Sequence, residues 1–210
     1  MNEIARTQQR TRSYWYCDGI AELVGGVALA LVGFPMIAAV RTGIDMLSTV
    51  ALMAMILLFP ATARVVGYLK DRITHKRTGY VKFPRPQMSR RRKWIVFALS
   101  LSVALTTMLL AIWGNEYTLN GIVGKTLLLG AGTGMAIAFV LRAAKLQIHR
   151  LYANAVVLAA VTIASAFASF GFMEGMGLLL AVLGSANVIT GGVTFAKYIQ
   201  QHPKAPSEAL

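Results

Sequence analysis

Two acidic residues at the start of the first long apolar segment are the best candidates for chemistry. Asp18 and Glu22 are four residues apart, which places both side chains on one face of a helix. An ionisable group at the edge of a membrane-spanning segment is costly unless it is paired or functional. The two acids could form an entry site for a cation or a proton, or pair with an arginine of a basic loop. Alternatively, the positive end of the helix dipole simply favours them there.

A run of four consecutive basic residues is the second candidate, and its expected chemistry is electrostatic. The residues are Arg90, Arg91, Arg92 and Lys93. They end a strongly basic segment, 67–93, in which Asp71 is the single acid. Each Lys or Arg near an anionic leaflet contributes about 1 kcal/mol of attraction. We therefore expect these four residues to bind anionic lipid headgroups or an acidic partner protein.

Residue patterns that would indicate catalysis or a cofactor are missing from the sequence. His75, His149 and His202 fit neither an HExxH motif nor another ligand spacing, and there is no GxSxG sequence. A single cysteine, Cys17, excludes an intramolecular disulfide. We interpret it as an inert thiol near the membrane surface, with acylation as the alternative. The sequence predicts a protein that is not an enzyme and needs no metal or cofactor.

The composition indicates an integral membrane protein. Of 210 residues, 56% are hydrophobic and only 14% are charged, whereas soluble domains are about 25% charged. The apolar residues form long unbroken runs. A net charge of +13 could suggest nucleic-acid binding. We reject that interpretation because the basic residues lie between the apolar runs, where they orient helices in a bilayer.

Six apolar segments are long enough to cross a membrane, which takes about 20 residues per helix. They cover residues 20–40, 46–66, 94–113, 121–141, 151–170 and 175–196, with a kink or early end expected at Pro60 in the second. The predicted fold is an all-α bundle of six transmembrane helices. We divide the chain into an N-terminal segment (1–19), helices one and two (20–66), the basic loop (67–93), helices three to six (94–197) and a tail (198–210).

The distribution of basic residues predicts the topology. They flank one side of the six segments, and the other side offers only Arg41 and Lys125. The positive-inside rule then places both termini in the cytoplasm. On the outer side, we expect a turn around Met173 and Glu174, with Glu174 solvated. The short loops favour the plasma membrane of a bacterium, that is, its inner membrane.

Small and mildly polar residues within the segments predict how the helices pack. Glycine and alanine are frequent in the last three segments, and small residues let helix backbones approach closely. Asn154 and Asn187 lie within segments five and six. Such residues usually form hydrogen bonds with a neighbouring helix.

Two classes of function are compatible with these features of the sequence. The first is a non-enzymatic accessory or regulatory membrane component, which binds lipid or a protein partner through the basic loop. The second is a transporter or channel for a small solute, acting alone or as a homo-oligomer. The near absence of charge deep in the apolar segments favours the first class.

Overall fold

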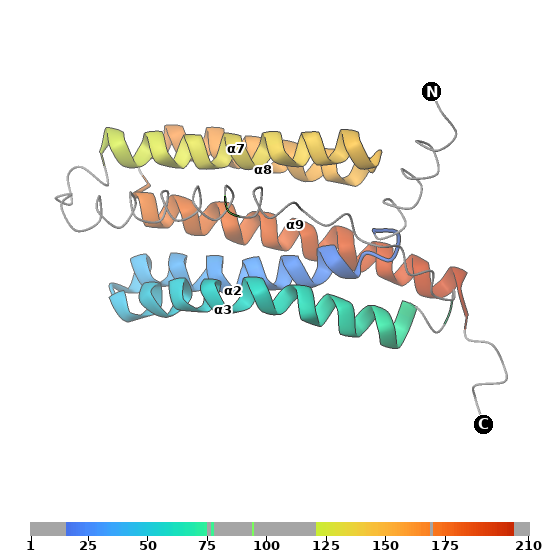
Figure 1. Cartoon of the computed structure of the whole chain (residues 1–210). Coiled ribbons are helices and arrows are strands. Elements are labelled where there is room, and N and C mark those ends of the chain that lie inside the picture. The colour runs from blue at the N-terminus through green and yellow to red at the C-terminus, as the bar shows by residue number, and fades with distance from the viewer. Residues whose placement is uncertain (1–15, 75–76, 78–93, 95–120, 169, 204–210) are drawn as a thin grey trace.

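The computed structural model describes residues 16–74, 77, 94, 121–168 and 170–203, and this part of the chain is almost entirely helical (Figure 1). The long helices are α2 (Ile20–Thr42), α3 (Asp45–Leu69), α7 (Ile122–Leu146), α8 (His149–Phe167) and α9 (Phe172–Gln201). A π-helical turn, η1 (Lys70–Thr74), continues α3. The predicted all-α fold is confirmed for these residues.

Three of these helices are long and apolar enough to cross a membrane, namely α2, α9 and the stretch Val123–Leu146 of α7. The bent α3–η1 unit makes a fourth if its two arms count as one crossing. Large apolar side chains on the outside of the bundle are more than half exposed, including Phe34, Ile56, Leu141, Val156 and Ile189. Lipid is the solvent that suits such a surface. The chain is therefore a membrane-associated helical protein.

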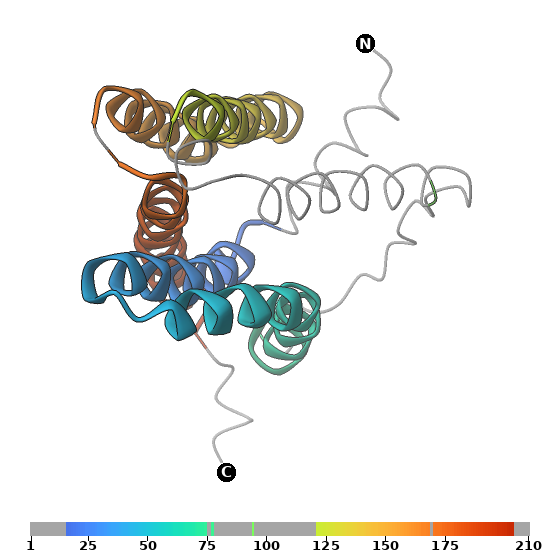
Figure 2. The same ribbon diagram turned by 90° about the vertical axis from the view of Figure 1, so that its left-hand side faces the viewer.

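Helix α9 lies in the middle of the bundle. The α2–α3 pair packs on one side of it and the α7–α8 pair on the other (Figures 1 and 2). Leu179 and Leu183 of α9 are buried against α7 and α8, where they contact Leu128 and Leu158. Leu180 faces the other way, into a cluster with α2 and α3. Most of the buried apolar contacts thus involve α9.

The contact between α2 and α9 is the most extensive in the described part of the chain, and it is built on paired glycines. The two helices run antiparallel. A methyl group added to Gly26 would lie 2.7 Å from the carbonyl oxygen of Gly184, and one added to Gly184 would lie 2.5 Å from the backbone nitrogen of Ala30. The glycines recur every seventh residue on both helices and oppose each other as Gly19 with Gly191, Gly26 with Gly184, and Gly33 with Gly177. The two backbones are therefore in direct contact over four turns.

Gly19 sets the position at which α2 begins. Its φ of 69° lies in the left-handed region that side chains disfavour. A Cβ atom there would also lie 2.5 Å from the carbonyl oxygen of Gly191. Both the backbone conformation and the approach of α9 thus require glycine. This residue places Asp18 and Glu22 on either side of the start of α2.

The predicted segments 121–141, 151–170 and 175–196 correspond to α7, α8 and α9, but α9 begins earlier than predicted. Met173 and Glu174 do not form a turn, because α9 already begins at Phe172. An acid is favourable in the first turn of a helix, which explains the early start. At its other end, α9 continues past residue 198 to Gln201.

Helix α3 bends by 51° between Met46–Leu58 and Pro60–Thr74, which confirms the kink predicted at Pro60. Beyond Val66, however, the chain continues as helix through Thr74, so the first part of the predicted basic loop is helical. The run Arg90, Arg91, Arg92 and Lys93 lies outside the described residues. So does the predicted third segment, 94–113, apart from Trp94.

Candidate functional site

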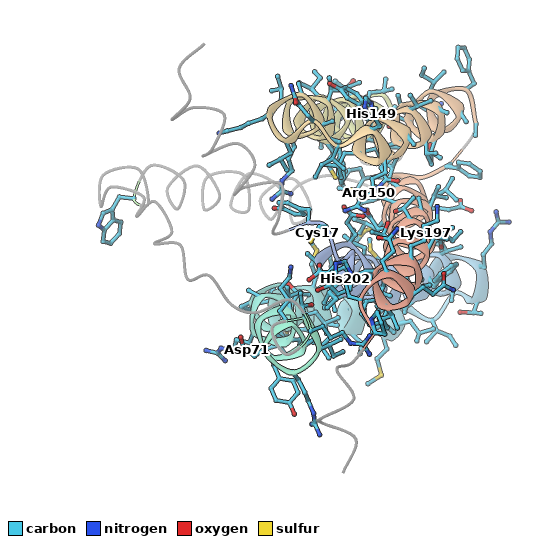
Figure 3. The ribbon with its side chains drawn as sticks, turned by 90° about the vertical axis from the view of Figure 1, so that its right-hand side faces the viewer. Cys17, Asp71, His149, Arg150, Lys197 and His202 are labelled. Atoms are coloured by element: carbon cyan, nitrogen blue, oxygen red, sulfur yellow. The ribbon has the colours of Figure 1, made fainter. Side chains whose placement is uncertain are left out.

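One end of the bundle, here called the basic end, collects most of the described charged side chains. It is the end at which α2 and α8 begin and α3, α7 and α9 finish (Figure 3). Exposed basic residues come from several helices at or near this end: Arg64, Arg72, Arg142, Lys145 and Lys197. Among the described residues, the only basic side chains at the opposite end are those of Arg41 and Lys125. The asymmetry predicted from the sequence is thus present in the described fold.

Asp18 forms a fully buried ion pair with Lys70. The Lys70 Nζ atom lies 3.0 Å from Oδ1 and 2.8 Å from Oδ2 of Asp18, and only 2% of Lys70 is exposed. The Thr74 hydroxyl donates to Oδ2 at 3.0 Å, and the backbone N–H of Ile20 donates to Oδ1 at 3.2 Å. Both carboxylate oxygens are therefore saturated. The pair joins the start of α2 to the turn that follows α3.

Glu22 forms a second ion pair, with Arg150 of α8. The Arg150 Nε atom lies 2.9 Å from Glu22 Oε1. The rest of the guanidinium donates to the Thr194 hydroxyl at 2.8 Å and to the backbone carbonyl of Tyr16. The arginine thus links α8, α9 and the segment before α2. Glu22 Oε2 is buried and has no hydrogen-bond partner in the described part of the chain.

The structure gives each of the two acids its own cation. Neither partner is an arginine of the basic loop, as the pairing interpretation had it: Lys70 is a lysine of that loop, and Arg150 belongs to α8. The bond from the Ile20 N–H to Asp18 also agrees with an acid at a helix N-terminus. We had grouped Lys70 and Arg150 with the basic residues that lie between the apolar runs and orient helices in a bilayer. The sequence signal for these pairs was the position of the two acids at the edge of an apolar segment, because a buried carboxylate requires a cation nearby.

A second polar layer lies one turn deeper, between α8 and α9. The Asn154 side-chain amide donates to Asn187 Oδ1 at 2.7 Å, and both residues are buried. The predicted hydrogen bond between neighbouring helices is confirmed for this pair. The same face of α8 also carries the buried hydroxyls of Thr162 and Ser165, which donate to carbonyl oxygens of α8 itself. Between the two polar stretches, the buried side chain of Leu158 interrupts the face.

Arg77 caps the end of α9. Its guanidinium donates to the carbonyl oxygens of Ile199, at 3.3 Å, and His202, at 2.7 Å. A helix C-terminus leaves its last carbonyl groups unpaired and attracts cations. This residue ties the beginning of the basic segment to the bundle.

At the opposite end, Arg41 and Glu174 form an ion pair of 2.7 Å. The Glu174 side chain is only 14% exposed, whereas that of Arg41 is 67% exposed. The prediction that Glu174 is solvated is therefore wrong. The Glu174 carboxylate lies in the first turn of α9, close to the end of α2, and there it pairs with Arg41.

Cys17 is exposed at the basic end, between Tyr16 and the buried Asp18. Partial burial raises the pKa of its thiol, and the neighbouring Asp18 carboxylate raises it further. A smaller fraction of the Cys17 side chain is therefore in the reactive thiolate form at neutral pH. This agrees with an unreactive interfacial cysteine.

Within the described residues, no group of three His, Cys, Asp or Glu side chains is placed to hold a metal ion. No known protein family, curated protein or solved structure matches the chain. The role of the polar groups at the basic end therefore has to follow from their own geometry.

The burial of the Asp18–Lys70 pair predicts a large effect of removing one partner. Lys70→Met leaves a buried carboxylate without its cation, and we expect a loss of about 3–5 kcal/mol in the free energy of unfolding. Denaturant unfolding in detergent micelles measures it. Adding Asp18→Asn to that variant should restore most of the loss, because the stranded charge disappears.

The matched control is Arg41→Met, which removes an exposed cation from the other end of the bundle. Exposed ion pairs contribute at most about 1 kcal/mol. Equal losses for Lys70→Met and Arg41→Met would contradict the assignment of Asp18–Lys70 as a buried structural pair.

Proposed function

We propose that the protein crosses the plasma membrane six times with both termini in the cytoplasm, in the inner membrane of a bacterium. The described helices support an additional crossing between α3 and α7. Arg77 lies at the basic end, beside the end of α9, whereas α7 begins at the opposite end, where Leu128 packs beside Gly175. The described residues on either side of the stretch 78–120 therefore lie at opposite ends of the bundle, which supports the proposal that the predicted segment 94–113 crosses the membrane.

The charge distribution supports the orientation. Basic residues at the basic end far outnumber those at the other end of the described bundle. Under the positive-inside rule, the basic end faces the cytoplasm. The cytoplasmic face then carries the exposed cations and the basic segment 67–93, and the two buried ion pairs lie beneath it.

Within this membrane, the protein acts as a non-enzymatic accessory or regulatory component. The observation that carries this proposal is that the buried charges of the basic end pair with one another and so hold the helices together, while the cations around them point outward. Direct backbone contact between α2 and α9 also leaves no passage between these two helices. A rigid bundle with a basic cytoplasmic face suits anionic lipid headgroups or an acidic partner protein.

A transporter or channel for a small neutral solute, alone or as a homo-oligomer, is the second candidate. The buried polar face of α8 favours it, since Asn154, Thr162 and Ser165 extend through much of the helix. Such a solute could exchange hydrogen bonds with these groups. Leu158 interrupts the face, so α8 would have to move relative to α7 and α9 for a solute to pass.

The six-span topology predicts where fused reporters will be found. A reporter fused after Gly43 or after Asn115 should be outside the cytoplasm, and one fused after Lys82 should be inside it. Paired alkaline phosphatase and green fluorescent protein fusions measure both compartments. Cytoplasmic reporters at Gly43 and Asn115 would overturn the proposed orientation, and opposite locations for these two would overturn the span count.

The accessory function predicts a bound partner. Purification of the full chain in a mild detergent should recover a stoichiometric protein or anionic lipid. Replacing Arg90, Arg91, Arg92 and Lys93 together by glutamine should remove it, because the attraction is electrostatic.

The control for this purification is the variant Arg41→Gln with Lys125→Gln, which removes cations from the other end of the bundle and should retain the partner. Retention by the fourfold variant would contradict binding through the basic loop. A chain that purifies alone, and that moves a solute into liposomes, would replace the accessory function with transport.

A further inference from the structure

We propose that Glu22 is a proton-binding site, whose Oε2 atom takes up a proton from the solvent at the basic end while Arg150 keeps its place in the bundle. The inference goes beyond the accessory function and does not depend on it. It rests on a difference between the two buried ion pairs, which otherwise look alike.

Asp18 has hydrogen-bond partners on both of its carboxylate oxygens. Both of its oxygens already accept hydrogen bonds, from Lys70, Thr74 and the backbone N–H of Ile20. Its cation, Lys70, is 98% buried. Protonation of Asp18 would leave this buried ammonium without a counter-charge, which is strongly unfavourable.

Glu22 differs in its own hydrogen bonds. Only 6% of its side chain is exposed, and one of its oxygens, Oε2, has no partner among the described residues. A buried acceptor without a donor costs free energy, more so when it carries charge. A proton on Oε2 removes this unsatisfied negative charge and leaves Oε1 free to accept from Arg150.

The cation that faces Glu22 also differs from Lys70. The Arg150 side chain is 22% exposed, so solvent can stabilise its charge. It also donates to two uncharged acceptors, the Thr194 hydroxyl and the Tyr16 carbonyl oxygen, and these remain when Glu22 is neutral. Protonation of Glu22 therefore does not strand a buried cation.

The other groups around Glu22 are compatible with a change of its charge. Two charged groups act on it, Arg150 from α8 and Asp18 from the segment before α2. Lys70 of η1 offsets the charge of Asp18, and α9 contributes the uncharged Thr194 hydroxyl. Arg142 of α7 reaches the Tyr16 hydroxyl, at 3.3 Å. The pair Glu22–Arg150 is then neutral when Glu22 is ionised and carries one positive charge, on Arg150, when it is protonated.

Proton uptake at this position weakens the link between α2 and α8. The ion pair to Arg150 is the contact by which Glu22 holds the start of α8. After protonation, the Arg150 guanidinium donates to a neutral carboxyl group instead of a carboxylate, so the attraction between opposite charges is lost. Acidification should therefore loosen α8 without affecting the Asp18–Lys70 pair.

An apolar carbodiimide, dicyclohexylcarbodiimide, tests the proposal on the full chain in liposomes. A protonated carboxyl group adds its O–H across one C=N bond of the reagent, and transfer of the acyl group to nitrogen gives a stable acylurea. No group leaves, so the carboxyl peptide gains the whole mass of the reagent. Mass spectrometry after digestion then reports the protonated carboxyl groups one by one.

We expect labelling of Glu22 that rises as the pH falls, with a decrease of about tenfold for each pH unit above the midpoint. Asp18 is the matched internal control and should stay unlabelled. Infrared difference spectra across the same pH range give an independent readout: a protonated-carboxyl band that is present in the natural protein and absent from Glu22→Gln.

The infrared measurement keeps the test decisive if the reagent cannot reach Glu22. Absence of both the label and the Glu22-dependent band at every pH would overturn the proposal and leave Glu22–Arg150 as a permanent ion pair. Equal labelling of Asp18 and Glu22 would overturn the distinction between the two pairs on which it rests.

Discussion

Direct backbone contact between α2 and α9 positions the buried ion pairs at the basic end. Gly26 and Gly184 leave no room for a methyl group between the helices, and Gly19 meets Gly191 just where α2 begins. This contact presents Thr194 of α9 to the first turn of α2, and α9 in turn positions α8 and its arginine. A spacing of seven residues keeps the small residues on one seam, as in other helix pairs with this period.

Between helices in lipid there is little hydrophobic attraction, because lipid tails are as apolar as leucine. Close packing at the glycines and the polar contacts of the basic end must therefore provide much of the specificity. The Asp18–Lys70 pair fits this role. A buried ion pair adds little net stability, but a shifted helix would strand a charge, and this penalises alternative arrangements. Of the two buried acids, Glu22 is held by fewer hydrogen bonds, because its Oε2 atom has no partner in the described part of the chain.

Much of the described fold follows from the sequence because it depends on local patterns. Apolar runs predicted α2, α7, α8 and α9, and Pro60 predicted the bend of α3. Asp18 and Glu22 stood out because acids are rare at such positions. Their cations could not be chosen from the sequence, since Lys70 and Arg150 come close only through long-range packing. The seven-residue spacing of glycines, in contrast, was visible in the sequence, and it marks a seam for close helix packing on both α2 and α9.

Comparison of two adjacent glycines tests the central claim most directly. Gly26 faces the backbone of α9, whereas a methyl group on Gly25 would meet nothing within 4 Å. In denaturant unfolding in detergent, Gly26→Ala should lower the free energy of unfolding by about 1–3 kcal/mol through overpacking. Gly25→Ala should be neutral or stabilising by up to about 1 kcal/mol, from helix propensity alone. Equal effects of the two substitutions would contradict the direct contact between α2 and α9.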